Sequence, residues 1–190
     1  MFLLPEQEME VLCMMNERKA RCMMKRFLCA VLALLLVPTV FAFAESAEST
    51  PVCGVDLNGN EVTTGIFTGA KLTVVNVWGT FCGPCIREMP DLGKLAAEYA
   101  DRGVRFVGII CDVDETVPAD EAKSIVEMTG AAYTHLLLNE YLYVRFASRS
   151  DYIPMTFLLD ENGQELEEEP RIGSMSYDMW KSLIDSCLGK

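Results

Sequence analysis

Histidine and paired cysteines are scarce in this sequence. The 190-residue chain contains one histidine, His135, and one C-x-x-C pair, Cys82 and Cys85. A structural zinc site built on such a pair needs a second Cys or His pair at suitable spacing, and the sequence offers none. This scarcity favours redox chemistry at Cys82 and Cys85 over half of a zinc site, so we expect no metal there.

Positive charge is also in short supply. The 16 Lys and Arg are outnumbered by 28 Asp and Glu, which gives a net charge of −12 at neutral pH. An acidic surface repels phosphate groups, so nucleic acid and anionic membrane are poor partners. We interpret the acidity as serving solubility. The sequence also lacks internal repeats and low-complexity tracts.

The N-terminal segment has the pattern of a secretory signal peptide. Residues 23–26 form a short basic stretch, 27–37 are uninterrupted apolar residues, and 42–44 supply the small residues of a cleavage site. An uncleaved membrane anchor over 27–44 is the alternative, since eighteen uncharged residues just reach bilayer length. Either interpretation predicts an extracytoplasmic protein, which is secreted, periplasmic or anchored on the outer side.

Four further boundaries follow from this interpretation. Residues 1–22 place four glutamates ahead of the signal peptide, so we interpret them as an unstructured upstream extension. The signal peptide then occupies 23–44, and 45–51 form a short polar tether. We expect one domain over 52–190, which is long enough for an ordinary core.

Apolar periodicity and turn residues predict an α/β domain with a parallel crossover. In the first half we expect a hairpin at 52–62, a strand at 72–78, a helix from 84 to 103 and a strand at 104–110. A helix at 119–129, a strand at 134–138 and a helix at 140–147 capped by Asn139 are expected next. The chain then continues with strands at 155–159 and near 164–168 and a terminal helix ending near 188.

Cys82 and Cys85 fall where the strand at 72–78 passes into a helix. The free N–H groups and positive dipole end of a helix stabilise a thiolate at Cys82. Cys85 lies one turn further on, close enough to pair with it. Cleavage after residue 44 leaves five of the eight cysteines. An odd number argues against a scaffold held together by disulfides.

The order of elements and two motifs resemble a known family. The order is similar to the thioredoxin fold, a central mixed sheet flanked by helices, here with an added N-terminal hairpin. The motifs W-G-T-F-C-G-P-C-x-x-E-x-P at 78–90 and I-P-M-T-F-L-L-D-x-x-G at 153–163 resemble the TlpA/ResA-like extracytoplasmic thiol-disulfide oxidoreductases. The resemblance covers 52–190.

The resemblance implies four catalytic residues. Cys82 corresponds to the exposed nucleophile that attacks a disulfide, and Cys85 to the buried thiol that resolves the mixed disulfide. Glu88, at i+3 from Cys85, corresponds to an active-site carboxylate that transfers the proton. The alternative for Glu88 is an exposed helix carboxylate. Pro154 corresponds to the cis-proline that faces the dithiol.

The resemblance also implies a substrate-binding surface. Its members lie around the two cysteines, either in the active-site loop or beside the proline; they are Trp78, Thr80, Phe81, Gly83, Pro84 and Ile153. The first three are expected to form an apolar rim around Cys82. Trp78 can equally be interpreted as a core aromatic. The backbone of Ile153 is expected to pair with an extended substrate. Asn76 is interpreted as a satisfied buried amide.

Partners and direction follow from the same chemistry. Gly83-Pro84 is the dipeptide of thioredoxin, a reductant, so we expect reduction of disulfide-containing proteins. The redox-active Cys82–Cys85 disulfide needs no further cofactor. An exported reductant requires a membrane electron donor, and we expect a monomer.

Two other classes of protein remain as alternatives. A peroxiredoxin-type thiol peroxidase has P-x-x-x-T-x-x-C around its cysteine, whereas Val75 and Gly79 occupy those positions here. A copper-binding assembly factor of the Sco type has C-x-x-x-C and a distal histidine, for which His135 is the sole candidate.

Cys111 can be interpreted as a third redox thiol or as a buried strand-end residue. Cys187 is expected in the core, and Cys53 stays unassigned.

Overall fold

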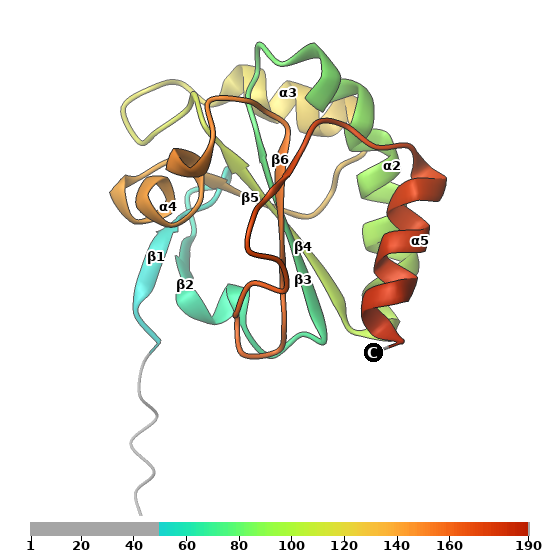
Figure 1. Ribbon diagram of the computed structural model, residues 1–190. Helices are drawn as coiled ribbons and strands as arrows, with labels where there is room; N and C mark the ends of the chain where they lie inside the picture. The colour runs from blue at the N-terminus through green and yellow to red at the C-terminus, as the bar shows by residue number, and fades with distance from the viewer. Residues whose placement is uncertain (1–49, 190) are drawn as a thin grey trace, which may run out of the picture. The chain divides into compact units, whose positions relative to one another are not determined.

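A five-stranded sheet forms the centre of residues 50–189, which the computed structural model describes (Figure 1). The strand order is β5-β4-β3-β6-β7. The strands span Leu72–Trp78 (β3), Val104–Ile110 (β4), Thr134–Leu137 (β5), Met155–Leu159 (β6) and Arg171–Ile172 (β7). β3, β4 and β5 run parallel, whereas β6 is antiparallel to β3 and β7 to β6. The expected parallel crossover is therefore confirmed.

Strand β3 lies in the middle of this sheet and is buried along its whole length. Its side chains alternate between the faces, with Val75 and Val77 in one cluster and Leu72 and Val74 in another. A strand covered on both faces needs apolar residues throughout. The exception, Asn76, donates from Nδ2 to Thr156 Oγ1 at 3.0 Å, as expected of a satisfied amide.

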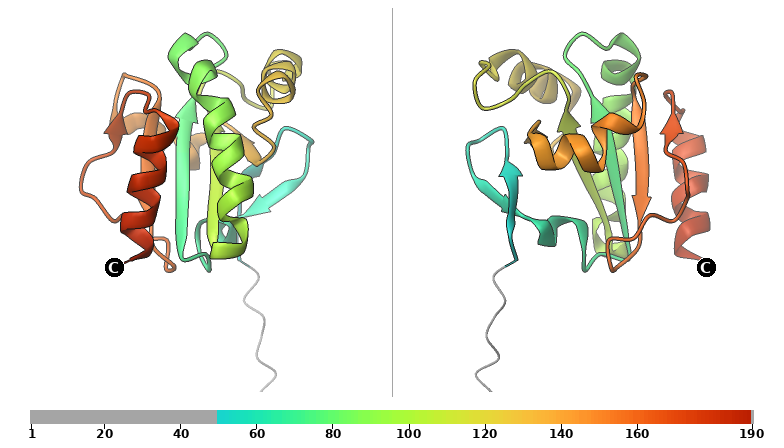
Figure 2. Two further views of the ribbon diagram at one scale, coloured as in Figure 1. Left: turned by 90° about the vertical axis from the view of Figure 1, so that its right-hand side faces the viewer. Right: turned by 60° about the vertical axis from the view of Figure 1, so that its left-hand side comes forward.

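Helices cover both faces of the sheet (Figure 2). Helices α2 (Gly83–Tyr99), α3 (Asp120–Thr129) and α5 (Tyr177–Leu188) lie on one face, and α4 (Glu140–Arg145) on the other. Short 3₁₀ turns occupy Thr64–Phe67, Ala100–Arg102 and Ala147–Arg149. Asn139 caps α4 as predicted, because its side chain accepts from Leu142 N–H.

A separate hairpin precedes the central sheet. Strands β1 (Val52–Val55) and β2 (Glu61–Thr63) pair antiparallel, so the added N-terminal hairpin is confirmed. Its turn contains Gly59 at φ 84°, a conformation that glycine adopts without steric cost. The Asp56 carboxylate accepts from Asn58 and Asn60 N–H and holds the turn closed.

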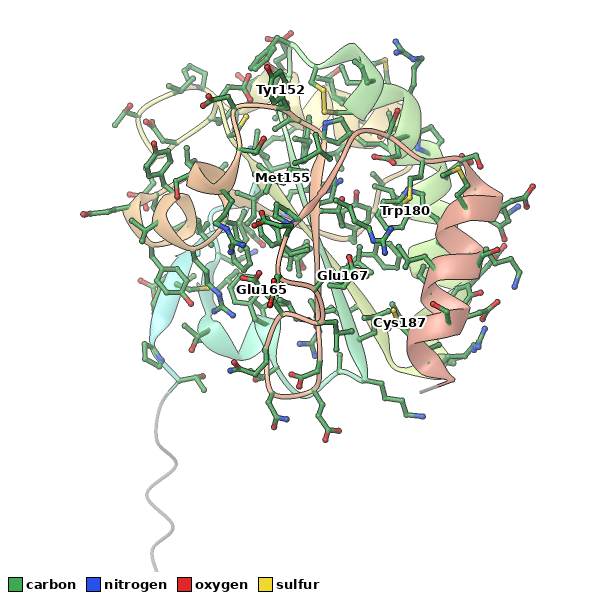
Figure 3. The ribbon with its side chains drawn as sticks, viewed as in Figure 1. Tyr152, Met155, Glu165, Glu167, Trp180 and Cys187 are labelled. Atoms are coloured by element: carbon green, nitrogen blue, oxygen red, sulfur yellow. A yellow bond between two sulfur atoms is a disulfide. The ribbon has the colours of Figure 1, made fainter. Side chains whose placement is uncertain are left out.

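The expected strand near 164–168 is wrong. A single bridge joins Leu159 to Glu165, and the partner strand of β6 is instead β7, where Met155 pairs with Ile172. Four glutamates between Glu165 and Glu169 place like charges close together, which disfavours a continuous ladder. Pairing resumes after Pro170, where the charge run ends. Glu165 and Glu167 are labelled in Figure 3 on this excursion.

The predicted signal peptide and upstream extension lie outside the described residues. Within 50–189, no helix combines the length and apolar character required to cross a membrane.

Candidate active site

Cys82 and Cys85 form a disulfide at the first turn of α2. Cys82 is the N-cap, and its Sγ accepts the Cys85 N–H at 3.2 Å. Strand β3 runs to the end of the domain at which α2 begins, so the pair lies at the strand-to-helix junction (Figure 2). A sulfur in this position receives a backbone hydrogen bond and the positive end of the helix dipole, both of which stabilise a thiolate.

The two cysteines differ in accessibility in the predicted order. Cys82 retains 5% of its surface and Cys85 retains 1%. In the oxidised state both are therefore buried, and Cys82 is the more accessible. Gly83 and Pro84, between them, form the start of α2, where the missing N–H of a proline costs nothing.

The loop before β6 faces the disulfide. The Ile153-Pro154 peptide bond is cis, as the resemblance implied. Cys82 Sγ lies 3.7 Å from the Ile153 carbonyl oxygen. Apart from this approach, no hydrogen bond between described residues uses the Ile153 backbone. The peptide group of Ile153 is thus available to an extended chain beside the sulfur.

Glu88 lies inside the domain on the same helix. It is 3% exposed, so the alternative of an exposed helix carboxylate is wrong. Its Oε1 accepts from Met175 N–H at 2.6 Å and from the Trp180 indole N–H at 2.8 Å. Its Oε2 is buried without a hydrogen-bond partner among the described residues. Burial raises the pKa of Glu88, and the two donated hydrogen bonds offset part of that rise.

Trp78 is a core residue and not part of the rim. It is 0% exposed, because its ring lies in the buried cluster that also contains Cys82 and Cys85. Its indole N–H donates to His135 Nδ1 at 3.1 Å, and the other ring nitrogen of His135 bonds the Ala131 carbonyl at 2.9 Å. Both nitrogens of the neutral imidazole ring therefore form hydrogen bonds. Burial lowers the pKa of His135 to about 4. This arrangement leaves His135 without a free nitrogen for copper.

Thr80 and Phe81 have different environments within the active-site loop. Thr80 donates its backbone N–H and its hydroxyl to the Asp112 carboxylate, at 3.0 and 2.5 Å. This interaction holds the loop against the end of β4. Phe81 is 74% exposed and is the one member of the expected rim that projects freely into solvent.

Several of these hydrogen-bond partners were not predicted from the sequence. Asp112, Met175 and Trp180 bond site residues that are 32, 87 and 92 positions away. The end of a strand parallel to β3 predicts Asp112 at the same edge of the sheet as Cys82, but it does not predict the bond to Thr80. The periodicity of α5 placed Trp180 in the core without indicating its partner; Figure 3 shows Trp180 between α5 and the sheet.

Three cysteines of the described region are unpaired: Cys53, Cys111 and Cys187. Cys53 is buried. Cys187, expected in the core, is partly buried on α5 and packs against the core cluster that contains Trp180 and Ile184. Cys111 is partly buried at the end of β4, and its N–H donates to the Trp78 carbonyl at 2.8 Å. Burial, with a contribution from Asp112, raises the pKa of Cys111 to about 11, so its thiol is protonated at neutral pH.

Comparison with known proteins places this geometry in a family. Residues 45–172 match the Redoxin family, to which the chain therefore belongs. ResA, a thiol-disulfide oxidoreductase of Halalkalibacterium halodurans, is 31% identical over 109 residues, which are 57% of this chain and 58% of that protein. ResA of Bacillus cereus strain ZK is 26% identical over 157 residues, 80% of this chain and 87% of that one.

Solved structures show the same fold. A thiol:disulfide interchange protein of the thioredoxin family from Chlorobium tepidum is 25% identical at a TM-score of 0.61, covering 73% of this chain and 94% of its own. A secreted Mycobacterium tuberculosis disulfide oxidoreductase, homologous to E. coli DsbE, has a TM-score of 0.57 at 21% identity and covers 70% and 93%. The thioredoxin-like fold and the likeness to ResA-type proteins are therefore confirmed.

Proposed function

We propose that this protein is an extracytoplasmic thiol-disulfide oxidoreductase that reduces protein disulfides through Cys82 and Cys85. The observation that carries the proposal is the disulfide at the N-terminus of α2, facing the free peptide group of Ile153 at 3.7 Å. Membership of the Redoxin family and the likeness to ResA support it.

The reaction begins with both cysteines reduced. The Cys82 thiolate attacks one sulfur of the substrate disulfide, forms a mixed disulfide and expels the other substrate sulfur as a thiolate, which takes up a proton. The Cys85 thiolate then attacks Cys82 Sγ and releases the second substrate thiolate. Two electrons pass from the dithiol to the substrate, and the Cys82–Cys85 disulfide is formed.

Local geometry supports these roles. Cys82 receives the Cys85 N–H at 3.2 Å in the oxidised state, and the same donor is available to a Cys82 thiolate. Cys85 is shielded from solvent, so it needs an internal group to accept its proton. Glu88 lies one turn away on α2, buried and with a raised pKa, and we assign it that role. The free peptide group of Ile153 pairs with the extended substrate.

Direction and location rest on the sequence. Gly83-Pro84, the dipeptide of thioredoxin, favours reduction, and the signal-peptide pattern at 23–44 favours export. An exported reductant must be re-reduced from the membrane, so a membrane dithiol donor completes the cycle. The substrate is a protein disulfide, and the protein works as a monomer.

Insulin reduction tests the proposal. With dithiothreitol as electron source, the protein should accelerate precipitation of the insulin B chain, and Cys82→Ser should abolish the acceleration. Cys187→Ser, at an unpaired cysteine away from the disulfide, is the matched control and should retain the wild-type rate. Equal rates for wild type and Cys82→Ser would contradict the proposal.

A further inference from the structure

A small cavity lies against Phe81 and Ile153, two neighbours of Cys82, on the α4 side of the sheet. Its volume is about 180 Å³, and its lining consists of Val77, Phe81, Cys111, Leu138, Tyr143, Ala147, Ser150, Asp151 and Ile153. Pockets that bury a drug-sized ligand measure about 300–1,000 Å³. This cavity is smaller than that range, and apolar side chains dominate its lining, so its size and chemistry suit a single apolar side chain.

Gly79 leaves room for three side chains that line the cavity. A Cβ built at Gly79 would lie 2.9 Å from Phe81 Cε1 and 3.2 Å from both Cys111 Sγ and Ile153 Cδ1. Three side chains from separate segments therefore converge on one point of the active-site loop. Of these, Phe81 immediately precedes Cys82, and Ile153 places its carbonyl 3.7 Å from Cys82 Sγ. Two residues that line the cavity, Phe81 and Ile153, therefore also adjoin Cys82.

Exposed aromatic side chains either line this cavity or adjoin its lining residues in sequence. Phe81 and Tyr152 are each 74% exposed, and Tyr143 on α4 is 52% exposed. Figure 3 shows Tyr152 at the end of the domain where α2 begins. Grouped exposed aromatics are typical of surfaces that bind another polypeptide, because they supply apolar area with little entropic cost.

The charge at the cavity restricts its occupant further. Asp151 is the one carboxylate in the lining, which contains no lysine, arginine or histidine. The chain as a whole is also acidic, at −12. An acidic side chain entering here would meet repulsion, whereas a lysine or arginine beside the apolar residue would face Asp151.

We propose that this cavity receives one apolar side chain of the polypeptide whose disulfide Cys82 attacks, with Asp151 favouring a Lys or Arg next to it. The proposal rests on the proposed function and adds the substrate class: extended segments with a large aliphatic or aromatic residue near the cysteine. An extended chain advances about 3.3 Å per residue. Since Phe81 and Ile153 line the cavity and adjoin Cys82, the apolar residue lies within about three positions of the substrate cysteine.

Kinetics with peptide dimers provide the first test. Each dimer joins two identical short peptides through one disulfide, so both sulfurs are equivalent, and one position within three residues of the cysteine is Leu, Ser or Asp. Reduced protein should reduce the Leu dimer about tenfold faster than the Ser dimer at one position, as burial of a leucine side chain implies. Asp should be slower still. Equal rates at every position would overturn the proposal.

A pair of variants localises the preference. Ala147→Leu extends a side chain into the cavity and should bring the Leu and Ser dimers to similar rates. Val144→Leu changes an exposed position on the neighbouring helix α4, where Val144 is 66% exposed and does not line the cavity, and it should keep the tenfold preference. A preference that survives Ala147→Leu, with the variant folded by circular dichroism, would place the apolar contact elsewhere and overturn the assignment.

Alkylation of Cys111 tests occupancy without any redox step. In the oxidised protein, a peptide with Ser in place of Cys and Leu at the preferred position should slow iodoacetamide labelling of Cys111, followed by mass spectrometry. The matched peptide with Ser instead of Leu should not. Equal labelling with both peptides would overturn the cavity proposal. If no dimer of any sequence is reduced while Cys111 is protected, the proposed function fails and the cavity assignment stands.

Discussion

The Glu88 carboxylate accepts the Trp180 indole N–H at 2.8 Å, an interaction that joins the active-site helix to the C-terminal helix across 92 positions. Together with the Met175 N–H, it holds one oxygen of a buried acid beneath the dithiol. A carboxylate removed from water in this way keeps its proton to higher pH than an exposed one. This relationship supports the proposed role of Glu88 as the proton carrier.

Replacing this acid should change the pH dependence of exchange. For Glu88→Gln, we expect the step in which Cys85 releases substrate to slow by about a hundredfold, the lower range for loss of an acid–base group. Its pH dependence in the range where Glu88 ionises should disappear. Stopped-flow fluorescence of mixed-disulfide decay measures this. Glu98→Gln, at an exposed position on the same helix, is the control, and an unchanged profile in Glu88→Gln would remove the proton-carrying role.

The same acid should affect stability. Because its pKa is raised above the ordinary 4.5, the folded state holds the proton of Glu88 over a pH range in which the unfolded state has lost it. The free energy of unfolding therefore falls as pH rises from 4.5 through the raised pKa. Glu88→Gln lacks this term, so urea titrations should show the variant gaining relative to wild type as pH increases. A difference independent of pH would contradict the raised pKa.

Trp180→Phe should distinguish the effect of the indole hydrogen bond on the pKa of Glu88 from the effect of burial. The donated N–H favours the charged carboxylate, so its loss should raise the pKa of Glu88 further and move the pH profile of exchange to higher pH. Leaving a buried acceptor partly unsatisfied should cost about 1–3 kcal/mol of unfolding free energy. Tyr177→Phe, which removes the exposed hydroxyl contact to Glu98, should leave the pH profile unchanged. An unshifted profile in Trp180→Phe would contradict the account.

His135 is the chain's single histidine, so its NMR titration is unambiguous. Burial lowers its pKa from 6.5 to about 4, and its Nδ1 must stay unprotonated to accept from Trp78. The Hε1 resonance should titrate near pH 4. Since the unfolded state takes up the proton first as pH falls below 6.5, stability should drop by about 3 kcal/mol between 6.5 and 4. A midpoint near 6.5 would contradict this burial.

Gly108 should tolerate no side chain. It pairs with His135 across β4 and β5, and a Cβ there would lie 2.1 Å from His135 Nδ1. Gly108→Ala should cost about 3 kcal/mol through overpacking and alter the Trp78 fluorescence. Gly65→Ala, whose Cβ would come no closer than 3.4 Å to the surrounding atoms, should change stability by less than about 0.5 kcal/mol. Equal stability of the two variants would refute the predicted contact.

Local patterns predicted most of the fold. The uncharged run at 72–78 and the periodicity of α2 located the strand-to-helix junction, because both signals arise from neighbours in sequence. The cis bond at Pro154 followed from the resemblance alone. The strand near 164–168 was wrong because alternation cannot weigh the repulsion among four glutamates against pairing at Ile172.

Many side-chain contacts between distant segments could not be predicted from the sequence. Trp78 lies four positions before Cys82, yet its ring points from β3 into the core, where it contacts His135 from 57 positions away. The cavity that Cys111 lines likewise requires α4, the loop before β6 and the active-site loop together. Nothing in the local pattern of one segment specifies the position of the others.

Trapping of the mixed disulfide tests the central claim most directly. Cys85→Ser, reduced and mixed with a disulfide-bonded peptide dimer, should accumulate one covalent adduct per protein, and mass spectrometry of the digested adduct should place the bond at Cys82. Such an adduct should be absent from the double variant Cys82→Ser, Cys85→Ser. Failure to trap any peptide, or attachment at Cys111 in place of Cys82, would contradict the assignment of Cys82 as the nucleophile.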